Sequence, residues 1–308
     1  MPGESQLAGG SPVDLAHSVL FFTTASSDPG ADNVLVEGEL TATGYRFTRG
    51  GVGSTVRVEL GIVTWDGWTV ERGVVPTNGM TDVDVTIPAV DLAHSFPLIS
   101  YSVSGGVYGA ADQVGAELLD ATRLHLRRRT VNAADLNVAW QVVTIPDATI
   151  VHDAMPFSGL MSSQGISPID ATRTFLVHTS TLDTAANAAS LLIESLEPSG
   201  GTIGFAREAS VGTADLSYYA VELAQGHVDK GEYAWSANES DHDISVPGPQ
   251  SAAFAFMQGG RSTSTVDAIP GRAWSTMTLV GDKVRLHREL AAATASGTVY
   301  WQRIELQR

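Results

Sequence analysis

Two pairs of aspartates, each separated by a single residue, are the first candidates for chemistry in this sequence. They are Asp82/Asp84 and Asp241/Asp243. Carboxylate oxygens at close spacing are typical of Ca²⁺-binding loops, but neither pair has the glycine and distal glutamate of an EF-hand. Residues two apart in a strand share one face. We therefore interpret both pairs as the polar outer face of a strand and predict no metal site.

The one basic cluster in the chain consists of Arg123, Arg127, Arg128 and Arg129. Such a cluster could bind phosphate or an anionic glycan. Arginine also pairs bidentately with carboxylates, and the rest of the chain is rich in these. We predict that the four side chains belong to a salt-bridged interface, within the protein or against an acidic neighbour, and favour an interface between subunits.

Aromatic side chains could provide surfaces for stacking on sugar rings. Trp140 and Trp301 occupy matching positions in related segments, and we predict that both are core residues. Trp68 and Trp235 lie near expected turns, so these two are the candidate glycan-stacking residues.

Motifs for catalysis and cofactor binding are missing from the sequence. The eight histidines show no H-E-x-x-H spacing, and no G-x-S-x-G or Walker pattern occurs. His17 and His94 precede serines, but a catalytic triad also needs an orienting third group. Because both lie in the same repeated hexapeptide, we expect a structural hydrogen bond at each. We predict a protein that is not an enzyme and binds no cofactor.

The composition restricts the classes of partner. The net charge is −16 over 308 residues, and such an acidic surface repels the phosphate backbone of nucleic acid. There is no cysteine, so disulfides and thiolate metal sites are excluded. The N-terminal segment lacks the pattern of a signal peptide, and no stretch of 18 apolar residues occurs. We expect neither a nucleic-acid partner nor a membrane partner.

The elements that position these residues repeat at intervals of about 80 residues. The hexapeptide V-D-L-A-H-S occurs at 13–18 and 90–95, and S-P-V-D at 11–14 matches S-P-I-D at 167–170. The segment 82–88 (D-V-D-V-T-I-P) matches 241–247 (D-H-D-I-S-V-P). Four similar segments end near Trp65, Ile145, Leu223 and Leu306. We predict four modules, here called modules one to four: 1–65, 66–146, 147–224 and 225–308.

The order of duplication has two interpretations. Modules one and three share S-P-[VI]-D, and modules two and four share D-x-D-[VI]-[TS]-[VI]-P, which suggests two tandem pairs. The V-D-L-A-H-S match between modules one and two competes with these matches and argues against this interpretation.

Within a module the hydrophobic pattern has a period of two. Val83, Val85 and Ile87 alternate with Asp84 and Thr86, as expected for a strand with one buried face. Several such segments are separated by glycine-, asparagine- and serine-rich connections. We predict an all-β protein of four tandem small antiparallel β-sandwich modules, with closed barrels as the alternative. A module this small buries little surface alone, so we also expect a homo-oligomer, a trimer or hexamer.

The second module resembles a known family. It contains W-T-V-E-R-G at 68–73, V-D-V-T-I-P-A-V-D-L-A-H-S-F-P-L-I-S-Y-S at 83–102, L-H-L-R-R-R at 124–129 and V-A-W-Q-V-V-T-I at 138–145. This order resembles the H-type lectin-like modules common in phage tail and fibre proteins. The resemblance implies a six-stranded antiparallel sandwich, trimeric or hexameric association and, in some members, sugar binding at the subunit interface.

These observations lead to a functional expectation. We expect a phage-like virion structural protein, a tail, neck, fibre or head-decoration component, that packs against itself and other virion proteins. Its location would be the virion, assembled in the host cytoplasm. The alternative is a lectin-like adhesin that binds host-surface polysaccharide. A polysaccharide-degrading enzyme is disfavoured, because no module shows a paired-carboxylate cleft of its own.

Overall fold

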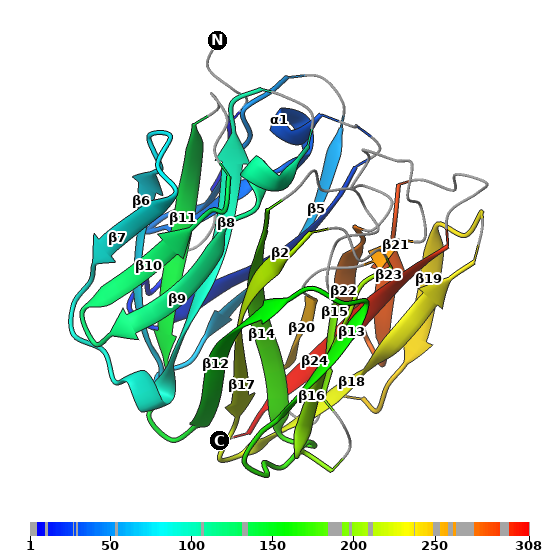
Figure 1. The fold of residues 1–308 in the computed structure, drawn as a ribbon. Coiled ribbons are helices and arrows are strands. Elements are labelled where there is room, and N and C mark those ends of the chain that lie inside the picture. Colours follow the sequence, from blue (N-terminus) through cyan, green and yellow to red (C-terminus); the bar gives the residue numbers. More distant parts are fainter. Residues whose placement is uncertain are drawn as a thin grey trace.

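The structure is a computed structural model. It describes the chain from residue 5 to 307 except 10–11, 27, 29, 53–54, 106–107, 131–134, 184–192, 197–198, 209–211, 237, 249–252, 258–260, 263–273 and 290–295. The architecture is all-β, with small antiparallel sheets stacked in pairs as sandwiches (Figure 1). None of the helices in the described part of the chain has the length and hydrophobicity needed to cross a bilayer.

Module two is a sandwich of two three-stranded sheets. The first sheet has the order β6 (Thr69–Pro76), β11 (Leu136–Thr144), β8 (Ser95–Val103). The second has the order β7 (Asp82–Thr86), β10 (Arg123–Arg127), β9 (Gly115–Asp120). Two short 3₁₀ helices, η1 (Leu92–His94) and η2 (Ala110–Asp112), flank β8 and β9.

Modules three and four have the same strand order. Module three contains the sheets β12 (Thr149–Phe157), β17 (Ala214–Glu222), β14 (Thr174–Leu182) and β13 (Met161–Gly165), β16 (Thr202–Ala206), β15 (Ile193–Leu196). Module four contains β18 (Gly226–Trp235), β24 (Gly297–Leu306), β20 (Ala253–Met257) and β19 (Asp241–Ser245), β23 (Lys283–His287), β22 (Thr276–Val280). A short extra strand, β21 (Arg261–Ser262), also pairs with β24.

Module one differs by one strand. Its sheets are β2 (Ser18–Ser26) with β5 (Val56–Thr64), and β1 (Ser5–Gly9), β4 (Gly44–Thr48), β3 (Glu37–Thr41). The one described α-helix, α1 (Ala31–Val34), precedes β3. Comparison of strand order shows that β5 corresponds to β11, β17 and β24, whereas no described strand of module one corresponds to β6, β12 and β18.

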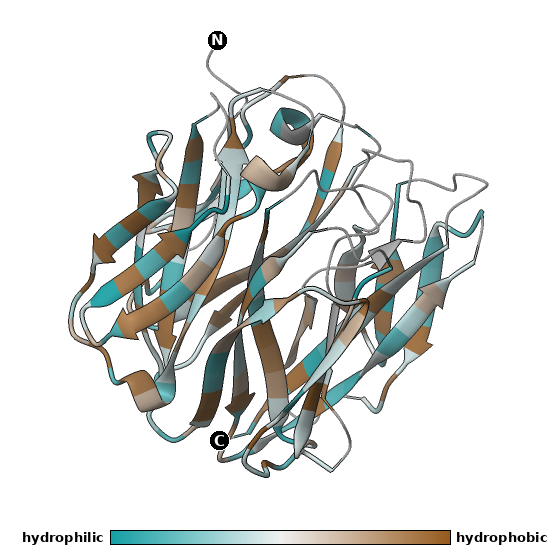
Figure 2. Ribbon diagram, in the orientation of Figure 1, coloured by the Kyte–Doolittle hydropathy of each residue, from teal (hydrophilic) through white to brown (hydrophobic). Residues whose placement is uncertain are grey.

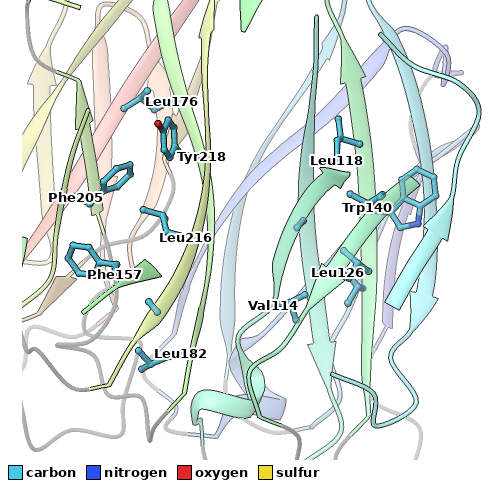
Figure 3. Packing of buried hydrophobic residues seen from close by; sticks show 14 of the residues in the cluster. Val114, Leu118, Leu126, Trp140, Phe157, Leu176, Leu182, Phe205, Leu216 and Tyr218 are labelled. Atoms are coloured by element: carbon cyan, nitrogen blue, oxygen red, sulfur yellow. The ribbon is translucent and has the colours of Figure 1, made fainter. Parts of the chain in front are cut away.

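The period-two pattern explains the cores. Apolar and polar residues alternate along most strands in Figure 2, and the apolar ones face the interior of each sandwich. In module two, Leu118, Leu126 and Trp140 are buried, and in module three Phe205 and Tyr218 pack similarly (Figure 3). The segment from Leu279, the nearest to a helical pattern in the sequence, continues β22 and leads into β23.

Candidate functional site: the interfaces and axis between modules

The four modules meet around a common axis. One strand of the interface-facing sheet of each module (β2, β8, β14 or β20) turns two side chains toward this axis. These eight side chains form the centre of one apolar cluster, here called the axial core, which also includes neighbouring residues such as Trp68, Val70 and Val228. The eight are Val19, Phe21, Phe96, Leu98, Phe175, Val177, Phe254 and Phe256. The Phe96 and Phe175 rings lie 5.6 Å apart and the Phe21 and Phe254 rings 4.5 Å apart. Modules two and three, and modules four and one, therefore touch directly at the axis.

A hydroxyl group joins neighbouring modules at equivalent positions. Ser100 Oγ in β8 accepts a hydrogen bond from Gly38 N–H (3.0 Å) and donates to Gly38 O (3.5 Å) in module one. Thr179 Oγ1 in β14 makes the same two bonds to Ala116 of module two, at 2.8 and 3.1 Å.

The same hydroxyl position also links the last module to the first. Thr23 Oγ1 in β2 accepts a 2.9 Å bond from Met277 N–H of module four. Module one thus contacts module four in the way that module two contacts module one, and the arrangement is cyclic. The corresponding position in module four, residue 258, lies outside the described residues.

A second set of contacts is shared only by alternate interfaces. Gln141 in β11 clamps the backbone of Leu20 in module one, with amide–backbone distances of 3.0 and 2.9 Å. Gln302 in β24 clamps Leu176 of module three identically, at 2.7 and 2.9 Å. The equivalent residue of module three is Tyr219, whose hydroxyl accepts a bond from Leu118 N–H.

Buried cations follow the same alternation. Arg72 of module two donates to the carbonyl oxygens of Leu15 and Ser18 in module one. Lys230 of module four donates to the carbonyl oxygens of Ala171 and Thr174 in module three. Burial lowers the pKa of both side chains, that of Lys230 to about 8. The repeated clamp favours an origin by two successive duplications, with modules one–two and three–four as the tandem pairs.

The predicted basic cluster divides between two roles. Arg129 makes a bidentate pair with Asp215 of module three, at 2.6 and 2.5 Å, and its Nη1 lies 3.4 Å from Asp183. Arg127 contacts the same Asp215 at 3.1 Å. The hydrogen bond from Arg129, with the nearby charges, lowers the pKa of Asp215. These two arginines therefore join modules two and three of one chain, rather than the two subunits favoured by the sequence analysis.

The other two arginines act within module two. Arg123 forms exposed ion pairs with Asp84 and Asp120. Arg128 is 2% exposed and donates to Ala111 O and Thr77 Oγ1. Burial lowers the pKa of Arg128. Neither side chain contributes to the contact with module three in the described structure.

The D-x-D pairs lie on strand faces, as predicted. Asp84 contacts His125 Nδ1 at 2.7 Å, and Asp243 contacts Arg285 Nε at 2.8 Å. These hydrogen bonds lower the pKa of each carboxyl group, that of Asp243 to about 2. Among the described residues, no group of three His, Asp or Glu side chains is arranged to hold a metal ion.

The repeated histidines make the structural hydrogen bond that the sequence predicts. His17 Nδ1 lies 2.7 Å from Asp14, and His94 Nδ1 lies 2.8 Å from Asp91. Each aspartate also accepts a hydrogen bond from the backbone N–H two residues later. This bond fixes the turn before β2 in module one and before β8 in module two.

The glycan-stacking prediction is wrong for both tryptophans as the structure places them. Trp68 and Trp235 are each 2% exposed. Trp68 packs in the axial core, and Trp235 donates its indole N–H to Ser275 Oγ beneath the guanidinium of Arg288. Both lie close to turns in sequence, but the strands carry their rings inward, so a sugar cannot reach them. Trp65, which is partly exposed, was not singled out by its spacing.

Two pockets lie along the axis, one on each side of the axial core. The first, here called the central pocket, has a volume of about 290 Å³ and is lined by all four modules. Its polar wall includes Tyr101, Tyr108, Gln113, His178 and Trp274. Burial raises the pKa of both tyrosine hydroxyls, so they remain protonated donors.

The second pocket, here called the turn pocket, has a volume of about 420 Å³. It is formed by the four module ends, Trp65, Ile145, Leu223 and Leu306, and by the turns that follow. Exposed Asp66, Asp147, Gln225 and Gln307 add oxygen and amide groups to its rim. An aromatic ring beside carboxylates and amides is a combination that can bind a polyhydroxylated or a cationic ligand.

Comparison with known proteins provides no family assignment. No protein-family model matches the sequence, and no curated protein shows significant similarity to it.

Proposed function

We propose that the chain is a non-enzymatic structural component of a phage-like particle, a tail, neck, fibre or head-decoration protein that acts by protein–protein packing. The observation that carries the proposal is the cyclic closure of the four modules. Ser100, Thr179 and Thr23 accept the same backbone hydrogen bond at three interfaces, and Gln141 and Gln302 repeat a backbone clamp at two. Polar groups that could have been used for chemistry are thus used for packing.

The charge distribution supports the same proposal. The net charge of −16 keeps a β-rich chain soluble at high local concentration. Because the module interfaces are satisfied within one chain, a trimer or hexamer of this 32.4 kDa protein would associate through other faces. Light scattering should give a mass of three or six chains.

Immunogold electron microscopy of intact particles tests the proposal, using antibodies raised against the folded chain. Regular labelling at one location on the particle is the expected result. Absence of the chain from purified particles, measured by mass spectrometry, would refute it.

The turn pocket favours one second candidate, a lectin-like adhesin that binds host-surface polysaccharide. Trp65 offers a partly exposed ring, and Asp66 and Asp147 offer carboxylates that can accept hydrogen bonds from sugar hydroxyls. Host-envelope glycans on an array should bind saturably, and Trp65→Ala should abolish binding. Trp274→Ala, which changes a partly exposed tryptophan in the central pocket instead, is the matched control. Binding that is equally lost in both variants, or found in neither the wild type nor the control, would exclude the adhesin.

A further inference from the structure

Module one contains an incompletely paired strand. In modules two, three and four, the last strand is the middle of its sheet, with β6 and β8 beside β11, β12 and β14 beside β17, and β18 and β20 beside β24. The corresponding strand β5 pairs along all nine residues with β2. Within the described ranges no strand pairs with its other edge.

The exposure of β5 shows the consequence. Ile62 is 36% exposed, whereas the equivalent residues Val142, Ala220 and Arg303 are 0%, 0% and 1% exposed. Val58 is likewise partly exposed, although its equivalents in the other three modules are completely buried. The surface that β6, β12 and β18 help to cover in their own modules is therefore accessible in module one.

The strands that pair with the equivalent edge in modules two and four, β6 and β18, show which sequence fits beside such a strand. In module two, Val70 lies opposite Val143 and enters the axial core. In module four, Val228 lies opposite Ile304 and does the same. Two residues later each strand carries a cation, Arg72 or Lys230, followed by a glycine. The residues that would face this pattern in module one are Val63, which is partly buried against the axial core, and Gly61.

The surroundings of Gly61 suit a cationic side chain. A Cβ atom built on Gly61 meets nothing within 4 Å, and a cavity of about 220 Å³ lies beside it between modules one and four. Glu59, on the same face of β5, also lines this cavity. A cation opposite Gly61 would be diagonal to the Glu59 carboxylate, which already pairs with Arg57 at 2.8 Å and would then lie between two cations.

We propose that this edge of β5 is an acceptor site for one extended strand of a partner protein, with a β-branched residue opposite Val63 and a cationic residue opposite Gly61. Backbone hydrogen bonds would supply affinity and these two side chains specificity. A second copy fits poorly, because when its Arg57 faces Gly61 its Glu59 lies opposite Glu59 of the first chain, and like charges directly opposite destabilise a strand pair. The segments of this chain that carry the pattern, β6 and β18, already pair with β11 and β24.

A synthetic peptide tests the site on the intact chain. The probe is a fluorescein-labelled peptide with the sequence of residues 68–76, W-T-V-E-R-G-V-V-P, and binding is followed by fluorescence anisotropy. A peptide with Glu in place of the Arg should bind at least tenfold more weakly. Ile62→Asp in the chain should also weaken binding at least tenfold. Leu119→Asp, at a side chain of similar exposure (42%) on β9, should leave affinity within twofold.

Hydrogen exchange locates the bound peptide. Slower exchange at 56–64 on peptide addition, with no change at 136–144, is the expected result. No saturable binding, equal binding by the Ile62→Asp chain, or protection elsewhere would overturn the proposal. Protection, already in the dilute chain, of the β5 amides that point away from β2 would show that its own residues cover the edge, and protection of these amides that rises with chain concentration would show that a second copy does. Either result also overturns it.

Discussion

Replacing Gly61 by glutamine should introduce, at the interface of modules four and one, the clamp that Gln141 and Gln302 make at two other interfaces. Gln141 and Gln302 each bind the backbone N–H and C=O of one residue in the preceding module. At the interface of modules four and one, Gly61 occupies the equivalent position and Ala255 the position of the clamped residue. Both line the same cavity, and nothing obstructs a side chain at Gly61.

The size of the effect follows from three contributions. Two new hydrogen bonds contribute about 0.5–1.5 kcal/mol each. Removing a glycine from a strand interior contributes roughly 0.5–1 kcal/mol. Ordering the glutamine side chain opposes these by about 1.5–2 kcal/mol. The net stabilisation of Gly61→Gln is therefore about 1 kcal/mol, which corresponds to a rise in Tm of roughly 2 °C for a chain of this size.

Differential scanning calorimetry measures this difference, with Gly61→Ala as the control that changes only the backbone contribution. We expect the highest Tm for Gly61→Gln, a lower Tm for Gly61→Ala and the lowest Tm for wild type. The reciprocal variant Gln141→Ala should destabilise by about 1–3 kcal/mol, because it leaves buried backbone groups of module one unsatisfied. If Gly61→Gln is no more stable than Gly61→Ala, the reasoning from the repeated clamp is refuted.

Four further predictions concern charged groups at the interfaces. Burial raises the pKa of Glu37 to about 7, so its contribution to stability is present below about pH 4.5 and is lost as the pH rises to 7. In urea unfolding, the free energy of unfolding of Glu37→Gln should therefore gain about 3 kcal/mol relative to wild type between pH 4 and pH 8. Arg129→Lys should cost about 1–2 kcal/mol by removing the bidentate pair with Asp215, against less than about 0.5 kcal/mol for the exposed Arg123→Lys, and equal costs would contradict the assignment. Because the pKa of Asp215 is lowered, its share of stability should be lost only as the pH falls below the ordinary aspartate range. The folded-state pKa of Lys230 of about 8 means that the unfolded chain binds more protons above this pH, so stability should rise between about pH 8 and 10.5 in wild type but not in Lys230→Met.

Several local features could be predicted because they depend on neighbours in sequence. Alternation at Val83, Val85 and Ile87 indicated a strand with one buried face, and β7 is that strand. The repetition of one hexapeptide indicated a structural hydrogen bond at His17 and His94, and each forms with an aspartate three residues earlier, Asp14 or Asp91.

The roles of the tryptophans and arginines could not be predicted in the same way. Proximity to a turn suggested that Trp68 and Trp235 face solvent, yet both are buried, Trp68 in the axial core shared by the modules and Trp235 in the core of module four itself. The partner of Arg129 lies in the next module at Asp215, a contact between residues far apart in sequence. An alignment of the four modules would have marked Gln141 and Gln302 as equivalent, but not what they clamp.

By itself, the sequence determined the strand pattern, the four modules and their kinship, because period-two alternation and internal repetition are properties of the chain read in order. Only the tertiary structure decided that the modules close on each other in a cycle, that the aromatic residues of β2, β8, β14 and β20 form one axial core, and that β5 retains an edge without a described partner. The physical reason is that every module has similar apolar and polar faces, so the local pattern permits many ways of docking. The choice among them is made by the fit of side chains such as Thr23, Gln141 and Arg129 against backbone and carboxylate groups brought together from distant parts of the chain.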